Sequence, residues 1–219
     1  WDMGADTPTG FGAVAYRGNN GTQDLSLGFE PDLVWIKKRG ASEYHVMFDT
    51  VRGLGDGKAL YPNADKNEGL YPNGNVSKTN SDGFTVATGS TGINYVNQSS
   101  QDYIAWGWDM GNTTATNTTG SINSTVRANP TYGQSIVSYT GNATSGATIG
   151  HGLSSTPEMI IVKNTQSTSN WAVLHKGLAD DYETDYIALN NSSNKTDNVA
   201  YWNDTEPTNQ VFSVGNDND

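Results

Sequence analysis

Aromatic side chains in turn-rich segments are the residues of this sequence best suited to hold a ligand. A Leu-Tyr-Pro-Asn motif occurs twice, at 60–63 and 70–73, and three further aromatic residues lie in turn-rich stretches. An aromatic ring offers a flat apolar face, and Tyr and Trp add a polar handle, which suits stacking on the C–H face of a sugar. The candidate ligand-binding residues are therefore Tyr61, Tyr71, Tyr95, Tyr182 and Trp202. The alternative is that these rings cover the ends of the fold or form a subunit contact.

Catalytic residues cannot be recognised in the same way. The three histidines, at positions 45, 151 and 175, form no HxH or HExxH pattern, so we expect structural roles for them. The sequence also has no GxSxG motif, no P-loop and no strand-linked GxGxxG motif. Carboxylates for a glycosidase are available, but any acidic protein offers such pairs. We therefore predict a protein that is not an enzyme.

Calcium is the metal that the sequence suggests most. Asn63, Asp65 and Asn67 alternate as oxygen ligands do in calcium loops, and the stretch 178–185 concentrates four carboxylates. However, Glu68 stands where an EF-hand loop needs glycine. We therefore expect no cofactor, with calcium kept as a possibility and an acidic surface loop as the ordinary interpretation.

Charge and composition argue against several kinds of partner. The formal net charge is −11, whereas a nucleic-acid-binding protein needs a basic surface to displace counterions. No stretch reaches the roughly 18 apolar residues of a membrane-spanning helix, so we expect no membrane insertion. The chain has no cysteine, which excludes disulfides, thiolate metal sites and cysteine catalysis.

Short strands must position the aromatic candidates. Segments 12–17 and 134–140 alternate apolar with small or polar residues, while 33–38 and 159–164 are short β-branched runs typical of buried strands. Turn-forming residues separate these segments, and a helical turn at most is expected at 51–60 and 175–182. The pattern predicts an all-β fold of two tandem β-sandwich modules, of the jelly-roll or concanavalin-like kind.

The strand segments occur twice in the same order. Residues 14–19, 27–39, 44–49 and 81–86 correspond to 137–142, 151–165, 170–175 and 209–214. Four collinear matches indicate tandem modules. We predict a tail of a preceding module and short linker at 1–10, module 1 at 11–110, a Thr/Asn-rich connection at 111–133 that could itself add a strand, and module 2 at 134–219.

The letters WDMG stand at 1–4 and return at 108–111, directly after the segment YIAWG. Module 1 therefore ends in YIAWGWDMG, but no counterpart of YIAWGW follows the last matching segment of module 2. We expect the chain to be a window from a longer array. We also expect module 2 to expose a strand edge or to borrow a strand from a neighbour.

Much of the sequence resembles a module of virion proteins of tailed phages, especially marine ones. The segments that carry the resemblance are 137–142, 150–164, 170–178, 186–190, 202–215 and 103–108. The resemblance covers most of both modules and implies a β-sandwich on the exterior of a particle or filament. It supplies no catalytic residue. The insertion at 60–80 departs from the pattern, and we expect any specialised loop to lie there.

The expected function is a non-enzymatic structural and adhesive module array of a viral appendage or virion surface, such as a tail fibre, capsid fibre or decoration. Weak contacts repeated along an array would support host-surface attachment through avidity. The expected partners are further copies in a homotrimer, other virion proteins and host surface polysaccharide, at a virion-surface or extracellular location. The alternatives are a lectin-like, carbohydrate-binding adhesin domain and a subunit of a cellular surface filament.

Overall fold

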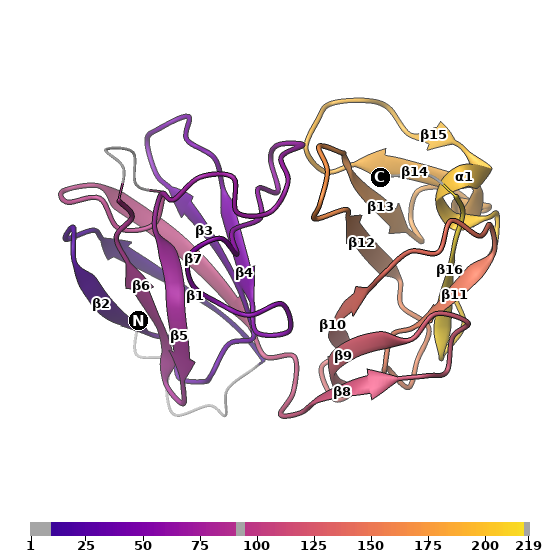
Figure 1. Cartoon of the computed structure of the whole chain (residues 1–219), viewed down its shortest axis with the longest axis horizontal. Coiled ribbons are helices and arrows are strands. Elements are labelled where there is room, and N and C mark those ends of the chain that lie inside the picture. Colours follow the sequence, from indigo (N-terminus) through magenta and orange to yellow (C-terminus); the bar gives the residue numbers. More distant parts are fainter. Residues whose placement is uncertain (1–9, 91–94, 217–219) are drawn as a thin grey trace. The chain divides into compact units, whose positions relative to one another are not determined.

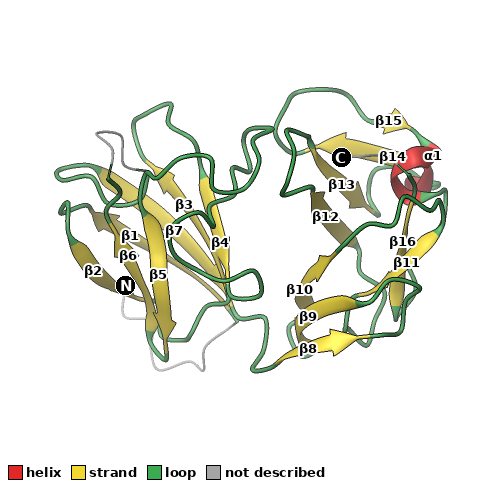
Figure 2. Cartoon of the chain, viewed as in Figure 1, coloured by secondary structure: helices red, strands yellow, loops and turns green. Residues whose placement is uncertain are grey.

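The computed structural model describes residues 10–90 and 95–216, so WDMG at 1–4 lies outside the described residues. The chain forms two compact units. Unit 1 runs to Leu60 and resumes over Gly69–Met110, while unit 2 takes Tyr61–Glu68 and the chain from Gly111 onward. The fold is nearly all β, with antiparallel sheets throughout (Figures 1 and 2). No helix in the described part of the chain has the length and apolar character needed to cross a membrane.

Unit 1 consists of two antiparallel sheets. The first has the order β1-β7-β3-β4, with β1 (Phe11–Arg17), β7 (Asp102–Trp108), β3 (Leu33–Lys38) and β4 (Val46–Asp49). The second has the order β2-β6-β5, with β2 (Thr22–Ser26), β6 (Gly83–Ala87) and β5 (Asn75–Asn80). Both sheets contribute fully buried side chains, including Ile36 and Phe84. The alternation of buried and half-buried residues along β7 follows the two-residue period of a strand.

Unit 2 contains three sheets and two short helical turns. The sheet β10-β9-β8 comprises β8 (Thr114–Asn117), β9 (Ser124–Asn129) and β10 (Gln134–Tyr139), and β11 (Ala147–Gly150) pairs with β16 (Val211–Val214). The third sheet comprises β12 (Met159–Lys163), β13 (Trp171–His175), β14 (Asp185–Ala188) and β15 (Thr196–Asp197). The turns are η1 (Tyr182–Thr184) and α1 (Val199–Trp202). The expected connection 111–133 thus belongs to unit 2 and forms two of its strands.

The two units repeat the same strand pairings in the same register. Leu33 of β3 pairs with Asp49 of β4, and the positions that match them in the sequence repeat, Met159 and His175, pair in β12 and β13. Likewise, Leu25 pairs with Phe84 in β2 and β6, and Ile149 pairs with Phe212 in β11 and β16. Since one residue of slip would turn every side chain to the opposite face, this agreement shows that the sequence repeat is also a structural repeat.

A lysine at the end of the third repeated strand makes the same two backbone contacts in both units, and Lys163 Nζ also donates to Ser169 Oγ at 2.8 Å. Lys37 Nζ donates to the carbonyl oxygens of Ala41 and Glu43, at 2.6 and 3.2 Å. Lys163 Nζ donates to those of Ser167 and Ser169, at 3.2 and 3.0 Å. The acceptors lie four and six residues after the lysine in each case. The ammonium group therefore closes the same loop twice.

The units differ where β7 lies. In unit 1, β7 pairs with β1 on one side and with β3 on the other (Figure 1). The matching strands of unit 2 are β10 and β12, and within residues 10–90 and 95–216 no strand joins them. There β12 has β13 as its strand partner, on one edge. The open edge expected in the second module is therefore present at β12.

Candidate functional site

Four of the five predicted ligand-binding residues are buried, and three of these four belong to unit 2. Tyr61 is fully buried, and its carbonyl oxygen accepts a hydrogen bond from the indole N–H of Trp171 at 3.0 Å. Tyr182 and Trp202 are buried together in one cluster with Leu174. Stacking on a sugar needs a ring face open to solvent, so the structure places these three residues in packing roles instead.

The other two predicted residues come together with a third tyrosine. Tyr71 stacks on Tyr44 with ring centroids 5.9 Å apart, and Tyr95 meets both edge-on, at 5.9 Å from Tyr44 and 6.4 Å from Tyr71. Tyr95 is itself buried, while Tyr44 and Tyr71 are half-buried. Only these last two rings can offer a face to a ligand. We call Tyr44, Tyr71 and Tyr95 the tyrosine cluster.

The surroundings of Tyr95 favour its neutral phenol. Burial raises the pKa of Tyr95, a hydrogen bond with the Asn73 side chain opposes that rise, and the nearby Glu43 carboxylate adds to it. The backbone N–H of Tyr95 donates to the carbonyl oxygen of Asn73 at 2.8 Å, which ties the two loop segments together. The Glu43 carboxylate and the Asn73 amide thus lie near Tyr95, the ring that Tyr44 and Tyr71 contact. This combination can bind a neutral polyhydroxylated ligand through stacking and hydrogen bonds.

Tyr44 was not predicted from the sequence as a ligand-binding residue, because its segment YHVMFD was recognised only as part of the repeat. Its neighbours in the cluster come from segments far along the chain. The signal that could have found it is its position directly before a buried strand, opposite the second Leu-Tyr-Pro-Asn motif. That proximity depends on the sheet order, which the sequence does not state.

A second aromatic surface lies on the first sheet of unit 1, on the face opposite the buried Tyr103 and Ala105. Phe11 and Trp108 are 5.1 Å apart between ring centroids, and Trp35 and Trp106 are 6.2 Å apart. These cross-strand pairs come from β1, β7 and β3. Phe11 is exposed, and the three indoles are half-buried.

A histidine fixes one edge of this surface. The indole N–H of Trp35 donates to Nδ1 of His45 at 3.1 Å, which requires the neutral ring with its proton on Nε2. Burial lowers the pKa of His45, and the positive charge of Lys37 lowers it further. The neutral form is therefore the stable one near neutral pH.

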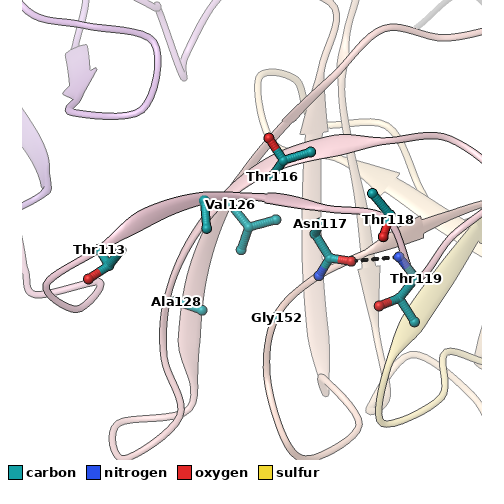
Figure 3. Close-up of a pocket in the computed structure, with 9 residues that line it drawn as sticks. Thr113, Thr116, Asn117, Thr118, Thr119, Val126, Ala128 and Gly152 are labelled. Atoms are coloured by element: carbon teal, nitrogen blue, oxygen red, sulfur yellow. Dashed lines mark hydrogen bonds between the residues drawn. The ribbon is translucent and has the colours of Figure 1, made fainter.

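A hollow of about 370 Å³ lies beside the β8–β9 hairpin of unit 2 (Figure 3). Threonines and an asparagine form most of its wall, and Asn117 Oδ1 accepts a hydrogen bond from the backbone N–H of Thr119 at 2.9 Å. Val126, Ala128 and Gly152 complete it. None of the nine lining residues carries a titratable group. The hollow can accept hydrogen bonds but offers no acid, base or charged nucleophile.

The segments considered for calcium make other contacts. Asp65 pairs with Lys66 at 3.3 Å, and its carbonyl oxygen accepts from the Ser169 N–H at 2.9 Å. Asp185 is buried and hydrogen-bonds the ammonium of Lys195. Over the ranges that the structure describes, no three His, Asp or Glu side chains converge on a possible metal position. The expectation of calcium therefore has no ligand group in those ranges.

Comparison with known proteins places the chain in a family. No curated protein and no solved structure has significant similarity to it. One family model matches residues 7–219, a span that includes both units, the tyrosine cluster and the aromatic surface. The chain belongs to the family described as Domain of unknown function (DUF7483).

Proposed function

We propose that this chain is a non-enzymatic structural and adhesive module pair of a viral appendage or virion surface, built as two tandem β-sandwiches. The observation that carries the proposal is the duplication itself. Two units share their strand pairings, their register and the lysine that closes the same loop. Repetition of one rigid unit is the arrangement expected of a fibre or decoration protein that spans distance and repeats weak contacts.

The location follows from the resemblance of the repeated segments to virion proteins of tailed phages. A display role needs an exterior surface that can contact partners, and unit 1 offers one in Phe11, Trp35, Trp106 and Trp108. Half-exposed aromatic residues on a sheet face are enriched in protein interfaces. We therefore assign this face to contacts with further copies or with other virion proteins, with a homotrimer as the expected assembly.

Particles of the virus that encodes the chain provide the test. Antibodies raised against the folded protein are expected to label the exterior of purified particles in immunogold electron microscopy, and its peptides are expected in the particle proteome. Sedimentation equilibrium of the protein is expected to give a trimer. Absence of the protein from purified particles, with the protein present in infected cells, would contradict the proposal.

Carbohydrate binding is the second candidate, and the tyrosine cluster favours it. Tyr44 and Tyr71 present half-buried rings beside Glu43 and Asn73. In a glycan array, the Tyr71→Ala variant is expected to lose binding, because it removes one of the two half-buried ring faces on which a sugar could stack. Tyr132→Ala, which removes an exposed tyrosine from the β9–β10 turn, is the matched control. No binding of the unaltered protein to host polysaccharide at millimolar sugar would remove this candidate.

A further inference from the structure

A strand position that β7 occupies in unit 1 is empty at the corresponding place among the described residues of unit 2. In unit 1, β7 lies between β1 and β3 and pairs with both along their lengths. The counterparts of β1 and β3 are β10 and β12, and among the described residues β10 pairs with β9 while β12 pairs with β13. Two pairings are shared between the units: β3 with β4 matches β12 with β13, and β2 with β6 matches β11 with β16. By this correspondence, the position between β10 and β12 is where a strand like β7 would fit.

The two flanking strands already lie on a common core. Val137 and Tyr139 of β10 pack against the cluster around Ile149 and Phe212, and Ile160 and Val162 of β12 pack against the same cluster. The ring centroids of Tyr139 and Phe212 are 6.2 Å apart. Both strands are therefore held over one layer, formed by β11 and β16, and no strand of the described part of the chain lies between them.

The open edge of β12 can accept a backbone ladder. The N–H of Lys176 donates to the carbonyl oxygen of Glu158 at 2.9 Å, so these two residues form a hydrogen-bonded pair. Such pairs alternate along antiparallel strands, and hence the N–H and C=O groups of Met159 and Ile161 point away from β13. The positions matching them in unit 1 are Leu33 and Trp35, which face Trp108 and Trp106 of β7.

The side chains at this edge are more exposed than those of an inner strand. Met159 is 55 % exposed and Ile161 is 38 % exposed, whereas Leu33 and Trp35 beside β7 are half-buried. An unpaired, apolar strand edge is a template for another chain. Strand addition gives affinity through backbone hydrogen bonds and specificity through alternate side chains.

We propose that unit 2 binds an extended peptide of the β7 type in the position between β10 and β12, antiparallel to both. The occupant is defined by its chemistry: a strand in which tyrosine and small residues face the core and aromatic or branched residues face outward, as in Tyr-Ile-Ala-Trp-Gly-Trp.

Unit 1 specifies what each occupant residue contacts. Tyr103 stacks on Tyr16 with centroids 5.1 Å apart, and Tyr16 corresponds to Tyr139, so the occupant's tyrosine stacks on Tyr139. The next inward residue is alanine, because Ala105 lies between Val14 and Ile36. Glycine comes next in unit 1, where a Cβ on Gly107 would lie 2.4 Å from Leu27 Cδ1. The outward residues cover Met159 and Ile161.

A labelled peptide with the sequence of residues 101–110 tests the proposal. Fluorescence anisotropy with the full chain is expected to show saturable binding. A peptide carrying proline in place of Ala105 is the matched control, because it keeps the aromatic residues but lacks one ladder donor. We expect it to bind at least about tenfold more weakly, which corresponds to about 1.4 kcal/mol.

A protein variant locates the binding to β12. Ile161→Pro removes an N–H that points to the open edge, and an edge strand tolerates proline at such a position. The variant should therefore not bind the peptide, while its thermal unfolding profile should stay close to that of the unaltered chain. Ile161→Thr keeps the N–H and should retain most of the binding. No saturable binding to the folded chain would overturn the proposal, and so would equal binding by Ile161→Thr and a folded Ile161→Pro. If Ile161→Pro fails to fold, protection of the Ile161 amide from hydrogen exchange on adding peptide decides the question in the unaltered chain.

Discussion

Replacement of the two loop-closing lysines by methionine tests whether the units are energetically equivalent. Lys37→Met and Lys163→Met keep most of the side-chain stem but remove the ammonium group. Each change leaves two backbone carbonyls without their donor: those of Ala41 and Glu43 in unit 1, and those of Ser167 and Ser169 in unit 2. The loss of these backbone contacts should destabilise the two variants by similar amounts, and Lys163→Met loses the hydrogen bond to Ser169 Oγ in addition.

The expected magnitude follows from the contacts. A hydrogen bond to a charged group contributes about 1.5–3 kcal/mol when well buried, but both lysines are only half-buried, and water can replace the lost donor. We expect each variant to lower the free energy of unfolding by about 1–2 kcal/mol. For a unit of about 100 residues, this corresponds to a fall of roughly 5–10 °C in Tm.

Differential scanning calorimetry is the assay, because it can separate the transitions of two units. Lys78→Met is the control, since it removes an exposed ammonium from β5 and should change stability by less than about 0.5 kcal/mol. If Lys37→Met is destabilised while Lys163→Met behaves like the control, the two loops are not equivalent, and the argument from the repeated contacts is refuted.

Three further predictions concern single residues. Gly28→Ala should lower the free energy of unfolding by about 1–2 kcal/mol, because Gly28 has a φ of +81° with open space around it. Gly152→Ala should lower it by more, since Gly152 has a φ of +75° and an added Cβ would lie 2.7 Å from Val126 Cγ1. Equal losses in urea denaturation would contradict this reasoning. Burial lowers the pKa of His45 below its usual 6.5, so the unfolded chain takes up a proton before the folded chain does as the pH falls. The free energy of unfolding should therefore decrease as the pH drops below about 6.5. His45→Gln should reduce this pH dependence in urea midpoints measured at successive pH values, and an unchanged pH dependence would contradict the prediction. Tyr61→Ala should lower the free energy of unfolding by about 3–5 kcal/mol, since its ring is fully buried; a loss below about 1 kcal/mol in chemical denaturation would show a surface role instead.

The strand segments and their repetition could be predicted from the sequence because they depend on local pattern. Short β-branched runs that end in lysine became β3 and β12. The aligned glycines at 28 and 152 both adopt positive φ, as a shared turn requires. Each of these features depends on residues that lie close together in the sequence, so the alternation of side chains and the turn-forming residues suffice to predict it.

The burial of the loop aromatics could not be predicted in this way. Tyr61 follows a turn-rich stretch, and locally it looks like an exposed residue, but its carbonyl is bonded by Trp171, 110 residues later. The segment Tyr61–Glu68 groups with unit 2 although unit 1 surrounds it in sequence. Such long-range packing leaves no periodic signal in the sequence. The expectation that the insertion at 60–80 is a specialised loop stays a prediction.

The single turn α1 also escaped prediction. It is four residues long, too short to show a helical period. Its ends depend on Asn198, whose side chain accepts from the Ala200 N–H, and on Asn203 in the left-handed conformation. Asparagines of this kind are common throughout the chain, so neither one marks a helix on its own.

Amide hydrogen exchange at Trp35 and Ile161 measures most directly whether β12 repeats the position of β3 but lacks a partner at the edge where β3 pairs with β7. These positions correspond in the repeat, and Trp35 faces β7 while Ile161 faces the open edge. In the chain without added peptide, the Trp35 amide is predicted to exchange slowly and the Ile161 amide rapidly. Slow exchange at both positions, or rapid exchange at Trp35, would contradict the shared plan and the open position in unit 2.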